Sequence, residues 1–317
     1  MFVLCSCKTK TEQEVNNLDI YDSSVFDNLP KTEANINPIL YLAESENGGK
    51  VYILGSIHCA DESSYQLPSY IMDAYKNSDA LAVEIDIVSY RNDKEAQQKD
   101  EEIITYKNND NLSKHIDPVI YSGIVEFIKN NSEDITVLES LKNKKPCAWL
   151  SELSNIECEK AGLSNEFGID DYFLNLAHND NKEIVEIESS SSQYEALNKI
   201  SDIAYEILFS EYAFADDDNI DESLRLTYEE WKKGEIQSTS DIDDAIVYED
   251  LSEEDKAIID YINILYIDRN VIMANKIKSF LNEGKNVFCT VGTEHLLGNK
   301  GIIETLKKEG YVVSKVK

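Results

Sequence analysis

The pattern of hydrophobic and polar residues predicts short strands in the N-terminal part of the chain and near its middle. Residues 39–43 and 51–57 are apolar runs around a turn sequence that contains Gly48-Gly49, so together they predict a β-hairpin. Residues 80–87 form a longer apolar run, whose length and flanks are typical of a buried strand. Residues 183–188 place successive side chains on opposite faces and predict a fourth strand.

Between these strands the pattern predicts helices, and it predicts a strand–helix–strand unit at the C-terminus. This unit has strands at residues 286–291 and 311–316, with a helix at 300–309 between them. The other helices are predicted at 67–76, 118–130, 147–161, 168–178 and 253–282. Because strands come from both chain ends, the economical arrangement is an α/β (α+β) fold. It has a central mixed sheet built from both ends and a large inserted helical layer.

The charge balance narrows the classes of function. The chain of 317 residues carries 61 Asp and Glu against 30 Lys and Arg, which gives a formal net charge of −31. Such a surface repels phosphate groups, so nucleic-acid binding is excluded as the main role. No run of about 20 apolar residues is present, so no membrane-spanning segment is predicted.

The six cysteines form no Cys-x-x-Cys pair, so neither a zinc knuckle nor a thioredoxin-type motif is predicted. Cys147 and Cys158 share a face of one predicted helix but lie about 16 Å apart along it, too far to bond to each other. Cys59 and Cys289 are expected to be small buried apolar residues, with a metal or redox role as the remote alternative.

The N-terminus resembles a bacterial lipobox. In the segment Met1–Cys7, Leu4 and Ser6 precede Cys7 as they would precede a lipid-acceptor cysteine. The apolar run before it is shorter than a signal peptide requires, so either the start is misplaced or the resemblance is accidental. We therefore expect a lipobox-like segment and polar tether at 1–33 and a single domain at 34–317. A real lipobox predicts an extracytoplasmic, membrane-anchored lipoprotein; otherwise the protein is expected to be secreted or cytoplasmic.

Two of the four histidines share a local pattern that points to chemistry. His58 ends Gly55-Ser56-Ile57-His58, and His295 ends Gly292-Thr293-Glu294-His295; each motif directly follows a predicted strand. Ligands bind at the carboxyl ends of strands in open α/β sheets, where glycine permits a tight turn. Glu84 interrupts a strand that should be buried, so it needs a cation or hydrogen bonds.

Two histidines and one carboxylate are a common ligand set for zinc, manganese or iron. A metal ion held by His58, His295 and Glu84 would lower the pKa of a bound water molecule. The alternative is a hydrogen-bonded Glu84 at a strand end, with two structural histidines. His115 and His178 show no such pattern and are expected to be surface or packing residues.

Four more polar residues are candidates for the same site. Arg269 and Asn270 lie inside the long predicted helix, where an arginine could stabilise an oxyanion or form a salt bridge with Asp268 or Glu84. Asp170 lies in the first turn of a helix, where an acid also favours the helix dipole. Glu188 ends a strand, where it could cap the following helix.

Two long segments resemble the TraB/GumN family. These are YILGSIHCADESSYQLPSYIMDAYKNSDALAVEID and VFCTVGTEHLLGNKGIIETLKKEGYVV, and the resemblance covers about residues 38–317. The family includes proposed metal-dependent proteases, such as the TIKI group, and bacterial pheromone-shutdown proteins. Its fold is similar to that of the ChaN and erythromycin-esterase group. The resemblance implies metal or catalytic roles for His58, Glu84 and His295, and site roles for Arg269 and Asn270.

The chain departs from the family pattern at Cys59 and Glu294, where the family usually has small or apolar residues. Our hypothesis is a metal-dependent hydrolase, a peptidase, that uses a divalent ion (manganese, cobalt or zinc) and takes a peptide or protein substrate. Arg269 would stabilise the oxyanion, and Glu188 or Asp170 would orient water. The alternatives are a non-catalytic module that binds a peptide or pheromone in the same crevice, and a structural envelope protein with a decayed site.

Overall fold

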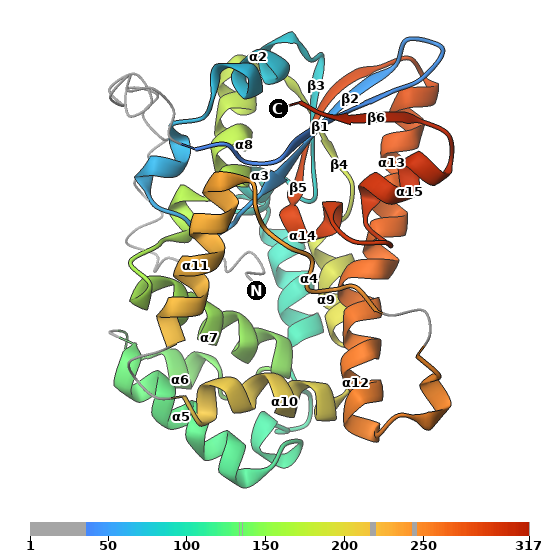
Figure 1. Ribbon diagram of the computed structural model, residues 1–317. Coiled ribbons are helices and arrows are strands. Elements are labelled where there is room, and N and C mark those ends of the chain that lie inside the picture. Colours follow the sequence, from blue (N-terminus) through green and yellow to red (C-terminus); the bar gives the residue numbers. More distant parts are fainter. Residues whose placement is uncertain (1–35, 133, 135, 216–219, 243–245, 317) are drawn as a thin grey trace.

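A computed structural model describes residues 36–316 apart from 133, 135, 216–219 and 243–245. The lipobox-like prediction at Cys7 therefore lies outside the described residues. Within them a six-stranded mixed sheet lies in the upper half of the protein as drawn in Figure 1. Its strands, in spatial order, are β4 (Glu183–Glu186), β3 (Ala80–Val83), β5 (Asn286–Gly292), β2 (Lys50–Ser56), β1 (Leu40–Glu44) and β6 (Val312–Lys315).

The sheet combines strands from both chain ends, which confirms the predicted α/β (α+β) fold. The four strands β4, β3, β5 and β2 are parallel, whereas β1 pairs antiparallel with β2 and with β6. The predicted hairpin is thus β1–β2. The strands β5 and β6 of the C-terminal unit are not neighbours, because β2 and β1 lie between them.

Helices cover the sheet and form a separate layer beside it. The α-helices are α2 (Ser69–Asn77), α3 (Ile87–Tyr90), α4 (Lys94–Ile104), α5 (Pro118–Asn131), α6 (Val137–Ser140), α7 (Pro146–Lys160), α8 (Ile169–Asp180), α9 (Ser190–Leu197), α10 (Asp202–Ala213), α11 (Ile220–Lys233), α12 (Glu253–Ile262), α13 (Asp268–Asn282), α14 (Thr293–Leu296) and α15 (Ile302–Lys308). Short 3₁₀ turns lie at Glu62–Tyr65, Leu112–Lys114, Asn165–Phe167 and Tyr248–Asp250. The predicted helix at 253–282 is α12 and α13 joined by a π-helical turn, Asn263–Ile267.

The parallel strands are apolar on both sides because both faces of the sheet are buried. Leu54 of β2 packs in one core with α2 and α8, while the neighbouring Ile53 packs in another with α13 and α15. A third core joins α5, α7, α10 and α12 in the helical layer, which lies below the sheet in Figure 1. The sheet thus presents its carboxyl edge to the helical layer.

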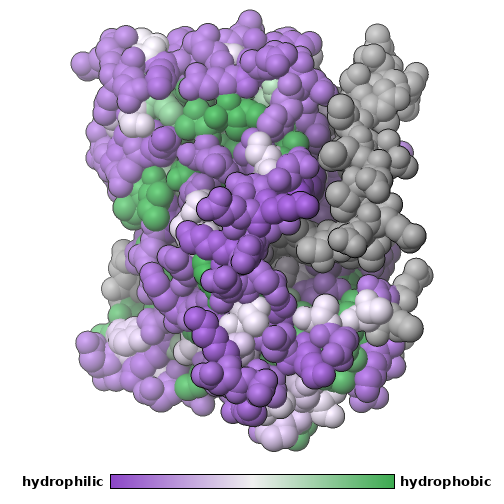
Figure 2. All heavy atoms as spheres, turned by 180° about the vertical axis from the view of Figure 1, so that it is seen from behind, coloured by the Kyte–Doolittle hydropathy of each residue, from purple (hydrophilic) through white to green (hydrophobic). Residues whose placement is uncertain are grey.

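The surface is largely polar, as the composition predicts. Figure 2 shows hydrophilic residues over most of the rear face, with apolar residues gathered in a few patches. None of the helices in the described ranges combines the length and hydrophobicity that crossing a membrane requires.

Two strand predictions were too long. The strand predicted at 80–87 ends at Val83, because Asp86 caps α3 by accepting a hydrogen bond from the Ser89 amide at 3.0 Å. Glu84 therefore follows the strand instead of lying within it. The strand predicted at 183–188 likewise ends at Glu186, so Glu188 lies in the connection to α9.

Candidate functional site

The carboxyl ends of β2, β5 and β3 meet beside a cavity of about 270 Å³. Ser56 and Gly292 are paired in register, so the two Gly-x-x-His motifs leave the sheet at the same level. Val83 pairs with Thr290, which brings Glu84 to the same edge. The register of three parallel strands therefore places His58, Glu84 and His295 around one cavity.

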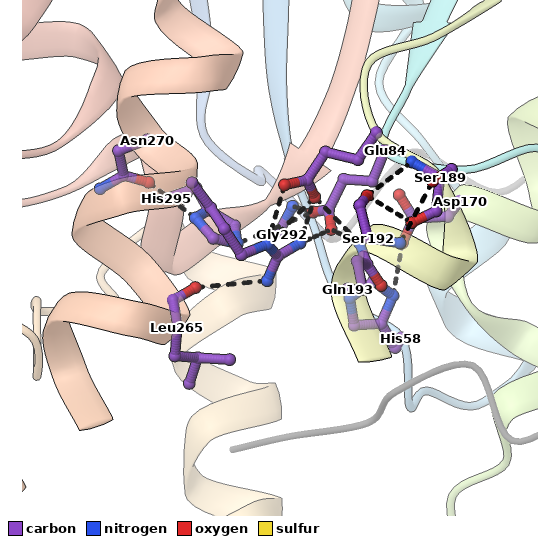
Figure 3. Close-up of polar contacts among 12 residues, drawn as sticks. His58, Glu84, Asp170, Ser189, Ser192, Gln193, Leu265, Asn270, Gly292 and His295 are labelled. Atoms are coloured by element: carbon purple, nitrogen blue, oxygen red, sulfur yellow. Dashed lines mark hydrogen bonds and ion pairs between the residues drawn. The ribbon is translucent and has the colours of Figure 1, made fainter. Parts of the chain in front are cut away.

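Both carboxylate oxygens of Glu84 accept hydrogen bonds from neighbouring groups (Figure 3). Its Oε1 accepts a hydrogen bond from the Gly292 amide at 2.8 Å. Its Oε2 accepts from Arg269 Nη2 at 2.6 Å and from Gln193 Nε2 at 3.3 Å. Burial opposes ionisation, but Arg269 and the two histidines outweigh it and hold the pKa of Glu84 at about 2. Glu84 is therefore a carboxylate at neutral pH.

Arg269 joins two buried carboxylates. Nη2 also donates to Glu188 Oε2 at 2.7 Å, and Nε donates to the same oxygen at 3.0 Å. Nη1 donates to the Leu265 carbonyl, inside the π-helical turn that precedes α13. The arginine side chain is 11% exposed, against 13% for Glu84 and 5% for Glu188. One cation between two carboxylates leaves this network with a net negative charge.

This arrangement corrects one expectation for the network and confirms another. Glu188 was expected as a helix cap, but Ser189 caps α9 and Glu188 pairs with Arg269. Asp268 and Glu84 were the two expected salt-bridge partners of Arg269, and the structure shows the salt bridge with Glu84. Gln193 completes the network, because its Nε2 donates to both Glu84 and Glu188.

His58 is paired with Asp170. The Nδ1 atom of His58 lies 2.8 Å from Asp170 Oδ2, at the start of α8. Helix α8 approaches the His58 loop closely: the Ile169 amide donates to the Ile57 carbonyl at 3.0 Å. Gly168 permits this, since a Cβ there would lie 2.7 Å from the His58 carbonyl oxygen. Burial lowers the pKa of His58, but Asp170 and Glu84 outweigh burial and raise it to about 9.

His295 is held in the opposite charge state. Its Nδ1 lies 2.7 Å from Asn270 Oδ1, and the Asn270 amide nitrogen donates to the Lys300 carbonyl at 3.1 Å. The amide is thereby oriented with its oxygen toward His295, so His295 donates through Nδ1. Burial and the nearby Arg269 lower the pKa of His295 to about 3. Its Nε2 therefore carries a lone pair that faces Glu84 Oε1 at 4.0 Å.

Gly292 marks the point where these groups converge. A Cβ at Gly292 would lie 3.5 Å from Glu84 Oε1 and from His295 Cδ2, and 3.8 Å from His58 Nε2. Figure 3 shows His295 and His58 on opposite sides of Glu84 and Gly292. The absence of a side chain at Gly292 thus leaves a small space bordered by one carboxylate and two imidazoles.

The comparisons with known proteins agree with these motifs. A model of the TraB/PrgY/gumN family matches residues 39–315. The chain belongs to this family. Two curated relatives, both named Uncharacterized protein YbaP, come from Escherichia coli (strain K12) and Shigella flexneri. Each is 27% identical over 156 residues, which is 48% of this chain and 53% of the relative, so the chain matches about half of their length. No solved structure matches it significantly.

All seven site residues expected in this TraB/PrgY/gumN chain lie at or directly behind the cavity. They are His58, Glu84, Asp170, Glu188, Arg269, Asn270 and His295. In the described part of the chain, however, no three or more His, Cys, Asp and Glu side chains are grouped so as to hold a metal ion as they stand. The metal site therefore remains a proposal for this family member.

A disulfide beside the site escaped the sequence analysis. Cys59, directly after His58, is bonded to Cys158 of α7, with 6.3 Å between their Cα atoms. Cys59 is buried in an apolar core, as expected, but it is one half of a disulfide that was not predicted. Pairing across 99 positions leaves no signal in the spacing of the cysteines. Cys147 and Cys289 are free and buried.

The two remaining histidines have acidic partners. His178 Nε2 lies 3.0 Å from both carboxylate oxygens of Asp86, and His115 Nε2 lies 2.9 Å from Asp110 Oδ2. His115 also stacks on the Tyr106 ring, with 4.7 Å between centroids. Neither histidine lines the cavity. Both can therefore serve as controls in experiments that alter or modify His58 and His295.

The raised pKa of His58 predicts a pH dependence of stability in metal-free protein. A folded-state pKa of about 9, above the ordinary value of 6.5, means that the Asp170 pair stabilises the fold fully below pH 6.5. This contribution is lost as the pH rises through 9. We expect the free energy of unfolding to fall between pH 6.5 and 9 in the wild type, and less steeply in His58→Gln. Equal slopes in denaturant titrations of the two proteins would contradict the pairing.

Proposed function

We propose that the protein is a metal-dependent hydrolase that cleaves peptide bonds. The proposed ligands of the divalent ion (manganese, cobalt or zinc) are His58 Nε2, His295 Nε2 and Glu84 Oε1. The observation that carries the proposal is the convergence of these groups around Gly292. Each histidine is also anchored through Nδ1, to Asp170 or Asn270, as metal-binding histidines usually are.

The donor set suits such an ion. Two atoms that each bind one ion at about 2.1 Å can stand up to about 4.2 Å apart. The 4.0 Å between His295 Nε2 and Glu84 Oε1 falls within that limit. The ionised Glu84 and the neutral His295 are in the protonation states that metal ligands require, whereas His58, whose pKa is raised to about 9, must release its proton when the ion binds. When bound, the ion would lower the pKa of a water molecule and so supply a nucleophile at neutral pH.

The surrounding residues have proposed roles of their own. Asp170 orients His58 so that Nε2 faces the cavity. Arg269 is engaged with Glu84 and Glu188, so its proposed role is to hold Glu84 in place. Ser56 is one of the residues that line the cavity, and its Oγ is buried without a hydrogen-bond partner among the described residues. Its hydroxyl is the donor we assign to the substrate carbonyl oxygen.

The cavity walls suggest the kind of peptide that fits. Apolar side chains line much of them, including Ile57, Ile85, Ile236, Leu265 and Tyr266. We therefore propose that an apolar side chain of the substrate occupies the cavity. The strongly acidic surface favours neutral or basic peptides as encounter partners.

A second candidate function is peptide binding without cleavage. Arg269 already neutralises Glu84 at 2.6 Å, which reduces the need for a metal ion there. A cavity with apolar walls and a fixed network of charges could capture a peptide in the same way. This candidate predicts a saturable binding site that works equally well with and without divalent ions.

Metal content separates the two candidates. Elemental analysis of protein purified without chelator should find about one divalent ion per chain, and His58→Ala with His295→Ala should abolish it. The matched control is His115→Ala with His178→Ala, which removes two histidines outside the cavity and should retain the ion. If the wild type binds no ion, and manganese, cobalt and zinc cause no thermal shift, the hydrolase proposal fails in favour of peptide binding.

A further inference from the structure

A segment without regular secondary structure crosses the rim of the cavity. We call residues 236–241, which follow α11, the strap. In Figure 1 this stretch runs from α11 across α14 toward α12. Ile236, Gln237 and Thr239 of the strap line the same cavity as His58 and His295. The strap therefore forms one wall of the candidate site.

One carboxylate holds the strap in place. Glu294 Oε1 accepts hydrogen bonds from the Thr239 amide at 2.8 Å, the Ser240 amide at 2.9 Å and Ser238 Oγ at 3.0 Å. Hydrogen bonds to a carboxylate are stronger than those between neutral groups. These bonds satisfy two successive backbone amides of a segment that has no strand partner, so the position of the strap depends on the side chain of Glu294.

The clamp lies within the second Gly-x-x-His motif. Glu294 directly precedes His295 on the short helix α14, so the clamp and a candidate ligand share one element. A second anchor follows, since Asp241 Oδ1 accepts a hydrogen bond from the Asn299 amide at 2.7 Å. The strap is bonded at both points to the connection between β5 and α15, at Glu294 and at Asn299. The strap is thus fastened to the part of the chain that carries His295.

We propose that Glu294 is a positioning residue that clamps the strap over the cavity, and that release of this clamp opens the route to His295, which is 4% exposed. The inference concerns access to the cavity. It applies equally to a hydrolase and to a peptide-binding module, and it does not require a bound metal ion.

Amide hydrogen exchange tests the clamp directly. In the full-length protein, Glu294→Ala should raise the exchange rate of a peptide covering the strap at least tenfold, and Glu294→Gln should have an intermediate effect because it retains one oxygen acceptor. Glu186→Gln is the matched control, since Glu186 Oε1 accepts from the Asp86 amide at 2.8 Å far from the strap in sequence. Unchanged exchange of the strap in Glu294→Ala would overturn the proposal.

Chemical modification tests access. In chelator-treated protein, diethyl pyrocarbonate should modify His295, which is 4% exposed, several-fold faster in Glu294→Ala than in the wild type. His115 and His178 should react at unchanged rates. Loss of protection in the strap without faster modification of His295 would show that the strap does not restrict access, and would overturn the second half of the proposal.

The two readouts need no turnover, so they separate this inference from the proposed hydrolase activity. Exchange in β2 and β5 reports whether each variant is folded. Should Glu294→Ala fail to fold, Asp241→Asn weakens the second anchor instead and should produce the same two changes to a smaller degree. If Asp241→Asn changes neither strap exchange nor the modification of His295, the clamp is refuted.

Discussion

Replacing Arg269 with methionine is expected to lower the free energy of unfolding by about 3–5 kcal/mol. Methionine preserves much of the volume of the side chain but leaves Glu84 and Glu188 buried without their shared cation. An unpaired buried charge costs far more than the loss of one exposed ion pair, because it cannot recover its hydration. Urea denaturation at pH 7, with the slope checked for two-state behaviour, measures the change.

The matched control for Arg269→Met is Lys307→Met. Lys307 also pairs with a carboxylate, Glu304, but these side chains are 44% and 42% exposed. Loss of this surface pair should change stability by about 1 kcal/mol or less. A rescue variant in which Glu84→Gln and Glu188→Gln accompany Arg269→Met should recover most of the loss. If Arg269→Met is no worse than Lys307→Met, the network is not a stabilising centre.

Removal of the Cys59–Cys158 disulfide is the second change with a large expected effect. Cross-linking residues 99 positions apart restricts the unfolded chain, and chain entropy alone allows about 4.7 kcal/mol for a loop of that size. We expect a loss of about 2–4 kcal/mol in Cys59→Ser with Cys158→Ser, because native-state strain and residual structure reduce the entropic limit. Thermal and chemical denaturation of the double variant measure it.

A reducing agent provides the control for the disulfide prediction. Dithiothreitol should destabilise the wild type and leave the double variant unaffected, since only the wild type has a bond to reduce. A wild type that is indifferent to the reductant would contradict the bond. A confirmed bond would support the proposed extracytoplasmic location, because disulfides persist in oxidising compartments. It also bears on the site, since the bond fastens the residue after His58 to the helical layer.

The sequence predicted those parts of the fold in which a residue pattern is compatible with a single type of secondary structure. The β1–β2 hairpin follows from two apolar runs around a glycine turn, and the parallel strands follow from apolar runs that must be buried on both faces. Strand ends were less predictable. The competition between strand and helix at residues 84–87 is settled by the Asp86 side chain, which caps α3. Such capping depends on an orientation that apolar periodicity does not encode.

The sequence predicted which residues form the candidate site, but not which of them pair with one another. Two glycine–histidine motifs after parallel strands identify residues that must meet at one sheet edge. The partners of Arg269 depend on how α13 packs after a π-helical turn, which has no signature in the sequence. The role of Glu188 and the cross-link at Cys59 likewise arise from contacts between distant segments. Local patterns therefore identified the participants, while tertiary packing determined their partners.

The strand order has a consequence for the way the chain is made. Strand β5 lies between β2 and β3, yet it is synthesised after both of them, after β4 and after helices α2 to α13. Until it emerges, the β1–β2 hairpin and the β3–β4 pair have no common neighbour and cannot unite into one sheet. Pairing between such distant segments is slow because a long loop must close first. The cavity edge, with Gly292 and His295, therefore forms only after β5 has left the ribosome, well after β2 and β3, so translation cannot assemble this site step by step.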